Sequence, residues 1–323
     1  MNLKISRQYA RIIGTACAVW TAAVFLAMPV FAETETTSEP KHDLPRALKP
    51  LSNVISPTLR HGAQFDFSSI SAKAVYVVDV PSHTVLLSQN AETLHPLASI
   101  TKLMTAYVAL DHAVPMMRKV IVSRDDEVGG ARLNVKSGTT LTVRDMFNAT
   151  LIGSANNMAN ALARSTRLTK DAFVAEMNAK AKTLGLMRTT FTEPTGIDAG
   201  NISNAKEIAA LGLETFALSE VRRSTTSMRY TIPLANGMRT VKNTNALLVD
   251  EKNGLYVLGG KTGYLEESNW NLVVKVRDAR RHPIEIVVLG STTKNQLFKD
   301  ATNIAHWVWD HYEWNSHPLS FRP

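Results

Sequence analysis

The sequence predicts a mixed α/β fold, with strands near both ends of the folded part and helices between them. Two β-branched apolar runs follow residue 70, three strand patterns lie between residues 254 and 289, and helical periodicity fills the interval. Strands enclosing a helical middle indicate one mixed sheet whose first and last strands meet, with helices packed on it in layers. The composition, 45% hydrophobic and 20% charged over 323 residues, excludes a disordered, collagen-like or polytopic membrane chain.

Each element follows from a local pattern. Strands are expected over 74–80 and 84–88, and Pro81-Ser82-His83 between them predicts a hairpin. Periodic apolar residues predict five helices, at 99–112, 143–152, 157–165, 170–184 and 205–218. Ser203 is placed to cap the last of these. Three strands and a closing helix complete the fold, at 254–259, 270–276, 284–289 and 296–312.

The N-terminal segment has the features of a cleaved export signal. In residues 1–32, three basic residues and no acidic one precede an apolar run, and Val30-Phe31-Ala32 suits a signal peptidase. An uncleaved membrane anchor is the alternative that the length of the apolar run permits. Cleavage after Ala32 would give an exported, periplasmic protein. It would also remove Cys17, the only cysteine, which excludes disulfides, a cysteine nucleophile and zinc–thiolate sites from the mature chain.

The remaining chain divides into three parts. Residues 33–69 are polar and rich in threonine and proline, which predicts a flexible tether. Residues 70–313 are expected to form the folded domain, and 314–323 a short tail. The net charge of +8, or +5 without the signal, suits a polyanionic environment.

Three short motifs carry the chemistry. They are Ser99-Ile100-Thr101-Lys102, Ser154-Ala155-Asn156 and Lys261-Thr262-Gly263. Ser-x-x-Lys also occurs elsewhere in this chain, so the surrounding sequence must show which copy is functional. Ser99 opens a strongly periodic helix, where free backbone N–H groups surround the hydroxyl and the helix dipole favours negative charge. Lys102 lies one turn further along the same face.

A serine acyl-transfer site follows from these residue types. A serine hydroxyl is a poor nucleophile, and a lysine activates it only when the lysine is neutral. Burial or a second cation would keep Lys102 neutral, and Lys261 is the candidate for that cation. Ser154 and Asn156 fall between two helices, where a loop can point both side chains into a cleft. Gly263, which has no side chain, would let a substrate backbone approach a strand edge closely.

The order and the flanks of the three motifs resemble the penicillin-recognising serine enzymes, specifically the low-molecular-mass D-alanyl-D-alanine peptidases. The resemblance covers about residues 70–312. Within this family the chain is most similar to the D,D-endopeptidases of the penicillin-binding protein 7 type. The similar segments are 98–106, 177–182, Phe191-Thr192-Glu193-Pro194-Thr195-Gly196 and Asn243-Thr244-Asn245. The fold that the resemblance implies is a central antiparallel sheet with flanking helices and a helical subdomain.

The resemblance also implies a role for each motif residue. Ser99 would form the acyl-enzyme, Lys102 would take its proton, and Ser154 with Asn156 would relay protons and hold the substrate amide. Lys261, Thr262 and Gly263 would bind the substrate, and the backbone N–H groups of Ser99 and Tyr264 would form the oxyanion hole. Tyr264 would need only its main chain. Lys294 lies about where carboxypeptidase relatives hold the terminal carboxylate of the substrate.

Four other interpretations of the motifs compete with this one, and the sequence argues against two of them directly. A β-lactamase of class A would need a Glu-x-x-Leu-Asn loop, which is absent after Glu193. A phosphate-binding loop would need glycine where Leu255 stands. A catalytically silent cell-wall binding protein is a third alternative, against which the intact motifs argue. A D-alanyl-D-alanine carboxypeptidase is the alternative within the family, although the lack of an extra C-terminal domain favours an endopeptidase.

The expected partners follow from the same resemblance. They are peptidoglycan stem peptides as substrates and β-lactam antibiotics as covalent inhibitors, with no nucleic acid and at most a peripheral contact with the membrane. No cofactor or metal is expected, because the nine histidines include no pattern of ligand spacing. Trp307, Trp309 and Trp314 are interpreted as core and terminal packing, with Trp314 a candidate for exposure.

Overall fold

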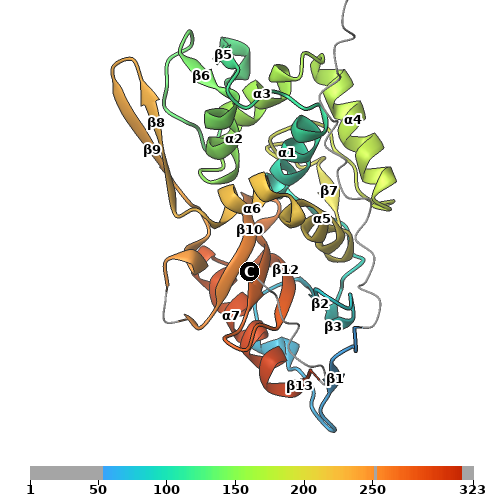
Figure 1. The fold of residues 1–323 in the computed structure, drawn as a ribbon. Helices are drawn as coiled ribbons and strands as arrows, with labels where there is room; N and C mark the ends of the chain where they lie inside the picture. Colours follow the sequence, from blue (N-terminus) through green and yellow to red (C-terminus); the bar gives the residue numbers. More distant parts are fainter. Residues whose placement is uncertain (1–53, 251–252, 315–323) are drawn as a thin grey trace, which may run out of the picture. The chain divides into compact units, whose positions relative to one another are not determined.

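The first and last of the strands that the sequence predicts meet in the middle of one sheet, as expected. The computed structural model describes residues 54–250 and 253–314. Five strands pair in the order β10-β11-β12-β2-β3 (Figure 1). Their bounds are β2 (Ala74–Asp79), β3 (Val85–Gln89), β10 (Tyr256–Leu265), β11 (Asn269–Arg277) and β12 (Pro283–Ser291). Every pair is antiparallel, which confirms the central antiparallel sheet that the family resemblance implies. The mixed sheet expected from the element order alone was wrong.

Helices cover both faces of this sheet. Helix α5 (Ala205–Ala217) packs on one face, and α7 (Lys294–His311) packs on the other. The molecule has one hydrophobic core on each face of the sheet. Because side chains alternate along a strand, neighbouring residues of β2 and β12 pack into different cores. Val287 of β12 joins the core on the α5 side, whereas Val288 joins the core under α7.

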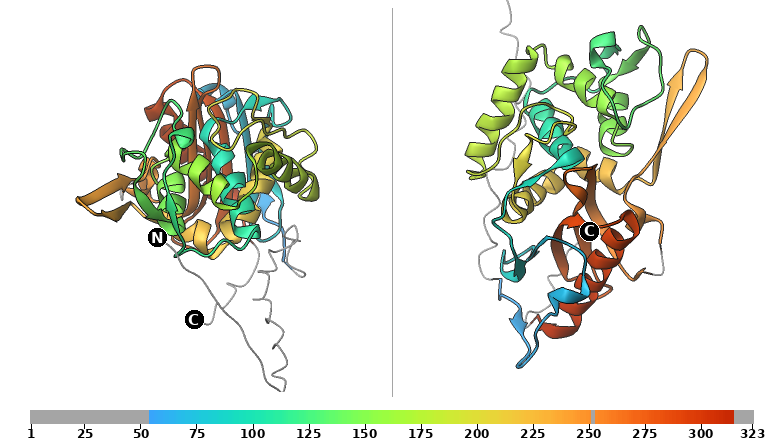
Figure 2. Two further views of the ribbon diagram at one scale, coloured as in Figure 1. Left: turned by 90° about the horizontal axis from the view of Figure 1, so that it is seen from above. Right: turned by 180° about the vertical axis from the view of Figure 1, so that it is seen from behind.

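The remaining helices gather at one end of the sheet, as Figures 1 and 2 show. They are α1 (Lys102–Asp111), α2 (Val143–Leu151), α3 (Asn156–Ser165) and α4 (Lys170–Thr183), with α6 (Ser219–Thr226) following α5. Side-chain caps explain where several of the helices begin. The Thr142 side chain accepts from the Asp145 N–H in a capping box that begins α2. The cap of α5 is Asn204, whose side chain accepts from the Glu207 N–H at 2.8 Å. The expected cap, Ser203, lies instead in the short strand β7 (Ile202–Ser203), which pairs with β4 (His95–Pro96).

A hairpin that the sequence analysis did not predict projects from the molecule. Strands β8 (Arg229–Leu234) and β9 (Gly237–Lys242) pair with each other and extend outward beside α2 (Figures 1 and 2). Tyr230, Ile232 and Val241 face the helices, and Ile232 is fully buried. A second small pair joins β5 (Lys119–Ile121) to β6 (Thr140–Thr142).

The folded domain begins earlier than predicted. Strand β1 (Thr58–Leu59) pairs with β13 (Tyr312–Glu313), and Phe65 is buried with its ring centroid 5.2 Å from that of Trp307. The expected tether over 33–69 is therefore wrong for its last part, because an aromatic residue in this polar stretch contributes to the core. The described tail also packs: the Trp314 indole donates to the Asp79 carboxylate at 2.9 Å. The signal segment lies outside the described residues.

No helix in the described part of the chain combines the length and the apolar character needed to cross a lipid bilayer.

Candidate active site

Three parts of the chain bring the predicted motifs together. Ser99 lies in a short 3₁₀ helix, η2 (Ala98–Thr101), that leads directly into α1. Ser154 and Asn156 lie where α2 ends and α3 begins, and the Lys261-Thr262-Gly263 motif lies inside β10. The motif had been expected at the end of a strand, but the strand continues to Leu265. Seven of the predicted residues line one cavity of about 290 Å³; they are Ser99, Ser154, Asn156, Thr262, Gly263, Tyr264 and Lys294.

Lys102 lies beneath the floor of this cavity and contacts three oxygen atoms. Its Nζ is 2.7 Å from Ser99 Oγ, 2.7 Å from Asn156 Oδ1 and 2.5 Å from the Thr195 carbonyl oxygen. The side chain is fully buried. The amide of Asn156 has only one orientation that suits both partners, because its Nδ2 donates to the Gly129 carbonyl at 2.7 Å. These contacts confirm the expected proximity of Ser99 and Lys102.

Both lysines of the site are unusually weak bases. Burial holds the pKa of Lys102 well below its usual value, and the positive charge of Lys261 lowers that pKa further. The negative charge of Glu193 acts in the opposite direction on Lys102. Burial alone lowers the pKa of Lys261 to about 7. The effect of Lys261 on the pKa of Lys102 has the direction that the prediction of a second cation beside Lys102 requires.

Lys261 joins the second motif to the third. Its Nζ donates to Ser154 Oγ at 2.9 Å and to the Thr262 carbonyl at 2.8 Å. Thr262 Oγ1 in turn donates to Thr244 Oγ1 at 2.6 Å. A chain of polar contacts thus runs from β10 to the loop before α3.

Two residues at the site have a left-handed backbone. Ala98, just before Ser99, has φ 50°, and Ser154 has φ 58°. Both are sparsely populated conformations for residues with a side chain, and such residues concentrate at functional sites. Both Ser99 and Ser154 line the same cavity.

Gly263 is required for a reason other than the predicted one. A Cβ atom at this position would lie 2.7 Å from the Leu97 carbonyl oxygen and 3.2 Å from the Ser99 backbone nitrogen. The glycine therefore allows the backbone of η2, which carries Ser99, to approach β10. Substrate approach was the predicted reason, and the structure gives no separate observation for it.

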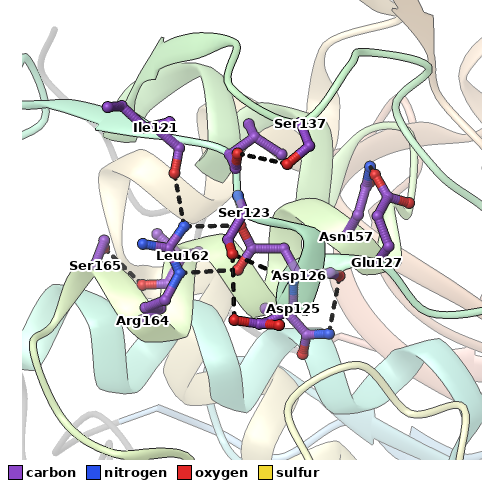
Figure 3. A network of polar contacts seen from close by, with 12 residues as sticks. Ile121, Ser123, Asp125, Asp126, Glu127, Ser137, Asn157, Leu162, Arg164 and Ser165 are labelled. Carbon is purple, nitrogen blue, oxygen red and sulfur yellow. Dashed lines mark hydrogen bonds and ion pairs between the residues drawn. The ribbon is translucent and has the colours of Figure 1, made fainter.

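The wall of the cavity beside Asn156 is a loop that α3 holds in place. Gly130 and Ala131 of this loop line the cavity, and the Ala131 carbonyl accepts from the Asn156 N–H at 2.7 Å. Asn157 exchanges hydrogen bonds with the backbone of Leu133 at 3.0 and 2.9 Å. About two turns further along α3, Arg164 pairs with the buried Asp126 at 2.7 Å (Figure 3).

Sequence reasoning missed several residues of the site. Thr195 contributes a backbone carbonyl, which leaves no side-chain signal. Trp270 and Ile197 line the cavity, and the Tyr264 ring packs on Trp270 with centroids 4.5 Å apart. Tyr264 therefore contributes its side chain as well as its main chain. Lys294 Nζ lies 5.9 Å from the Trp270 ring centroid. Apolar residues paired across two strands, as Tyr264 and Trp270 are, were a usable signal.

Within residues 54–250 and 253–314, no three histidine, cysteine, aspartate or glutamate side chains lie close enough to hold a metal ion.

Comparisons with known proteins agree with this geometry. A family profile described as "Peptidase S11: D-alanyl-D-alanine carboxypeptidase" matches residues 61–293. A D-alanyl-D-alanine endopeptidase of Pseudomonas aeruginosa is 32% identical over 78% of this chain and 82% of its own. A mutant of the Streptomyces K15 DD-transpeptidase superposes with a TM-score of 0.69 at 26% identity, covering 75% and 98% of the two chains. Penicillin-binding protein D2 of Listeria monocytogenes, in a cefotaxime-bound form, superposes with a TM-score of 0.66 at 28% identity, covering 76% and 99%.

Proposed function

The chain belongs to the D-alanyl-D-alanine carboxypeptidase family of serine peptidases, and we propose that it cleaves D-alanyl linkages of peptidoglycan through an acyl-enzyme on Ser99. Its fold is that of the penicillin-recognising serine enzymes. The reaction needs no cofactor in this proposal, because an amine and a hydroxyl of the chain supply the base and the nucleophile.

The observation that supports the proposal most is the set of three partners around Lys102 Nζ. Two of them, Asn156 Oδ1 and the Thr195 carbonyl, can only accept hydrogen bonds. A neutral amine has two N–H groups and one lone pair, so its N–H groups donate to these two oxygens. The lone pair is left for the one partner that can donate, the Ser99 hydroxyl at 2.7 Å. This arrangement is that of a base ready to take the hydroxyl proton.

Acylation follows from this geometry. Ser99 Oγ attacks the carbonyl carbon of a D-alanyl residue while its proton passes to Lys102. The backbone N–H groups of Ser99 and Tyr264 are the proposed donors to the oxyanion, since both residues line the cavity. When the tetrahedral intermediate collapses, the C–N bond breaks and the leaving amine takes a proton that Ser154 relays. Water then repeats the sequence in place of the amine and releases the acid.

The substrate side of the site involves Lys261 and Thr262. A charged Lys261 beneath Ser154 and the Thr262 hydroxyl favour a substrate carboxylate next to the scissile bond. A cross-linked stem peptide carries such a carboxylate on the carbon that bears the leaving amine. We propose this D,D-endopeptidase reaction as the main activity, and its support is the naming of the similar Pseudomonas aeruginosa protein.

Carboxypeptidase activity is the second candidate. The ammonium group of Lys294 lies at the same cavity as Ser99, and it is suited to a free terminal carboxylate. The two activities share the acylation step and differ only in the leaving group.

β-Lactams are proposed to acylate Ser99 and to remain attached. In the class A β-lactamases a free glutamate activates the deacylating water. Here the Glu193 carboxylate already accepts from the N–H groups of Thr195 and Gly196 and from the Asn201 side chain. It is therefore engaged in holding its own loop.

One experiment tests the proposed function. We expect a fluorescent penicillin to label the wild-type protein covalently and durably, and Ser99→Ala to remain unlabelled, because the acyl bond requires the hydroxyl. The same two proteins are then incubated with cross-linked muropeptide dimers and with monomeric pentapeptides, and the products are separated. Dimer cleavage by the wild type alone supports the endopeptidase. Release of D-alanine without dimer cleavage would support the carboxypeptidase, and an unlabelled wild type would contradict both.

We also propose that the protein is exported and acts in the periplasm. The support is the export-signal pattern of residues 1–32 together with a substrate outside the cytoplasm. An intact mass that corresponds to 291 residues would agree with cleavage after Ala32.

A further inference from the structure

We infer that Glu193 is a positioning residue for the catalytic lysine, because its carboxylate clamps the peptide unit whose carbonyl oxygen binds Lys102 Nζ. The inference rests on the proposed function, since it concerns the base of that reaction. It assigns a role to a residue that does not touch the substrate and that none of the three motifs contains.

The peptide unit between Thr195 and Gly196 connects the two side chains. On one side its N–H, from Gly196, donates to Glu193 Oε1. On the other side its carbonyl oxygen, from Thr195, accepts from Lys102 Nζ at 2.5 Å. A trans peptide is planar, so its N–H and C=O point in opposite directions and fixing one fixes the other. The carboxylate thereby sets the direction of the carbonyl that holds Lys102.

The clamp leaves this loop little freedom. Glu193 Oε2 also accepts from the Thr195 N–H at 2.6 Å, and the carboxylate is mostly buried, with the residue 8% exposed. The preceding carbonyl, of Pro194, accepts from Thr105 Oγ1 of α1 at 2.5 Å. Gly196 has φ 80°, and a Cβ there would overlap the Ala98 carbonyl. The loop is thus fixed against the segment that carries both Ser99 and Lys102.

The same carboxylate reaches the nucleophile through Asn201. Asn201 Nδ2 donates to Glu193 Oε1 at 2.5 Å, and the Asn201 carbonyl accepts from the Leu97 N–H at 2.8 Å. Leu97 begins the turn into Ser99. One buried charge therefore orients an acceptor of the lysine and supports the turn before the serine.

Glu193 affects Lys102 through its negative charge as well as through the hydrogen bonds that fix the loop. Among the described residues, Lys261 and Glu193 are the charged groups that shift the pKa of Lys102, in opposite directions. Burial lowers the pKa of Lys102 most, and the charge of Lys261 lowers it further, which favours the neutral base. Glu193 limits this effect, so the two charges together set the pH at which Lys102 becomes reactive.

The test uses the full chain and the rate of acylation by a fluorescent penicillin between pH 5 and pH 9. We expect Glu193→Gln to lower the maximal rate at least tenfold, because the amide N–H₂ faces the Thr195 N–H and disturbs the clamped peptide. The acid limb is the part of the profile in which the rate rises with pH as Lys102 loses its proton. We expect this limb to move to lower pH, because the pKa of Lys102 falls when the negative charge is lost. A residue with only a structural role would not move this limb.

Two further variants separate charge from position. Glu193→Asp retains the charge but is one methylene shorter, so the acid limb should stay near that of the wild type while the rate falls. Glu207→Gln is the matched control: this carboxylate also accepts from a backbone N–H, that of Arg188, and from the Thr189 hydroxyl, away from the site. It should leave both the rate and the limb unchanged.

Glu193→Gln with a rate within twofold of the wild type and an unmoved acid limb would overturn the inference. If that variant does not fold, Glu193→Asp decides alone, and a rate within twofold of the wild type would again refute the clamp. Failure of the proposed function is a different result, because the wild type itself would then remain unlabelled.

Discussion

At the scale of single residues, the site depends on keeping an amine neutral. Lys102 was predictable because a serine and a lysine three residues apart on one helix meet by local geometry alone. Its third partner, the Thr195 carbonyl, was not, because a backbone oxygen some 90 residues away leaves no pattern in the sequence. Glu193 was noticed only as part of a family segment. Its function depends on the loop conformation, which side-chain types do not reveal.

The two lysines make opposite demands on pH. Lys102 must lose its proton to act as a base, whereas Lys261, with a pKa of about 7, would hold a carboxylate in the proposed reaction only while protonated. Acylation by a carboxylate-bearing β-lactam should therefore rise with pH through the pKa of Lys102. It should then fall as pH passes about 7 and Lys261 loses its proton.

Lys261→Met tests this assignment. The variant removes a cation that lowers the pKa of Lys102, so we expect the acid limb of the acylation profile to move to higher pH. The alkaline limb should disappear, and the rate should fall at every pH because the carboxylate loses its partner. Stopped-flow labelling with a fluorescent penicillin measures both limbs. An acid limb that stays in place would show that the charge of Lys261 does not control Lys102.

At the scale of elements, the order of strands and helices was largely predictable and the β8–β9 hairpin was not. The sheet strands are apolar on both faces and are bounded by turn residues, which makes their signal strong. The hairpin has only one apolar face, formed by alternate residues such as Tyr230 and Ile232. Such an alternation followed by Asn236-Gly237 is typical of a hairpin, so the hairpin could have been predicted from the sequence.

The approach of α5 to the sheet depends on Gly212. A Cβ at this position would overlap Glu285 Oε1 and lie 2.9 Å from Val273 Cγ2. Glu285 is fully buried, and burial raises its pKa well above the usual value. The residue therefore has little room to move away.

We expect Gly212→Ala to lower the free energy of unfolding by up to about 2 kcal/mol. The gain in helix propensity, about 1 kcal/mol, is smaller than the cost of overpacking against a rigid sheet, typically about 1–3 kcal/mol. Urea denaturation followed by circular dichroism measures the change. Lys206→Ala, on the exposed face of the same helix, is the control and should change stability by less than about 0.5 kcal/mol. A more stable Gly212→Ala would show that α5 can shift freely.

At the scale of the whole molecule, the fold includes more of the chain than its composition suggested. Residues 58–69 were assigned to a tether because they are polar and contain no periodic apolar pattern. Contacts with the C-terminal end of the domain make part of this segment belong to the fold. Strand β1 pairs with β13, and Phe65 packs against Trp307 of α7. Contacts between the two ends of a domain have no local signature, so periodicity cannot detect them.

Phe65→Ala should therefore destabilise the protein even though it lies in a polar stretch. Truncation of a buried phenylalanine costs about 3–5 kcal/mol in well-packed cores, and the lower end applies here because the site lies near the surface. Thermal unfolding measures the loss. Phe67→Ala, which removes a partly exposed ring from the same segment, should have a smaller effect. Equal melting temperatures for Phe65→Ala and the wild type would show that this segment does not contribute to the folded core.

The pairing of β2 with β12 limits when the enzyme can first become active. A chain that is synthesised from its N-terminus offers β2 and β3 long before β12, the other partner of β2, which follows some 200 residues later. Until then β10 and β11 cannot join β2 and β3 in one sheet, because β12 lies between the two pairs of strands. A translation product that stops before β12 therefore lacks the strand that joins β11 to β2, and we expect it not to form the acyl-enzyme.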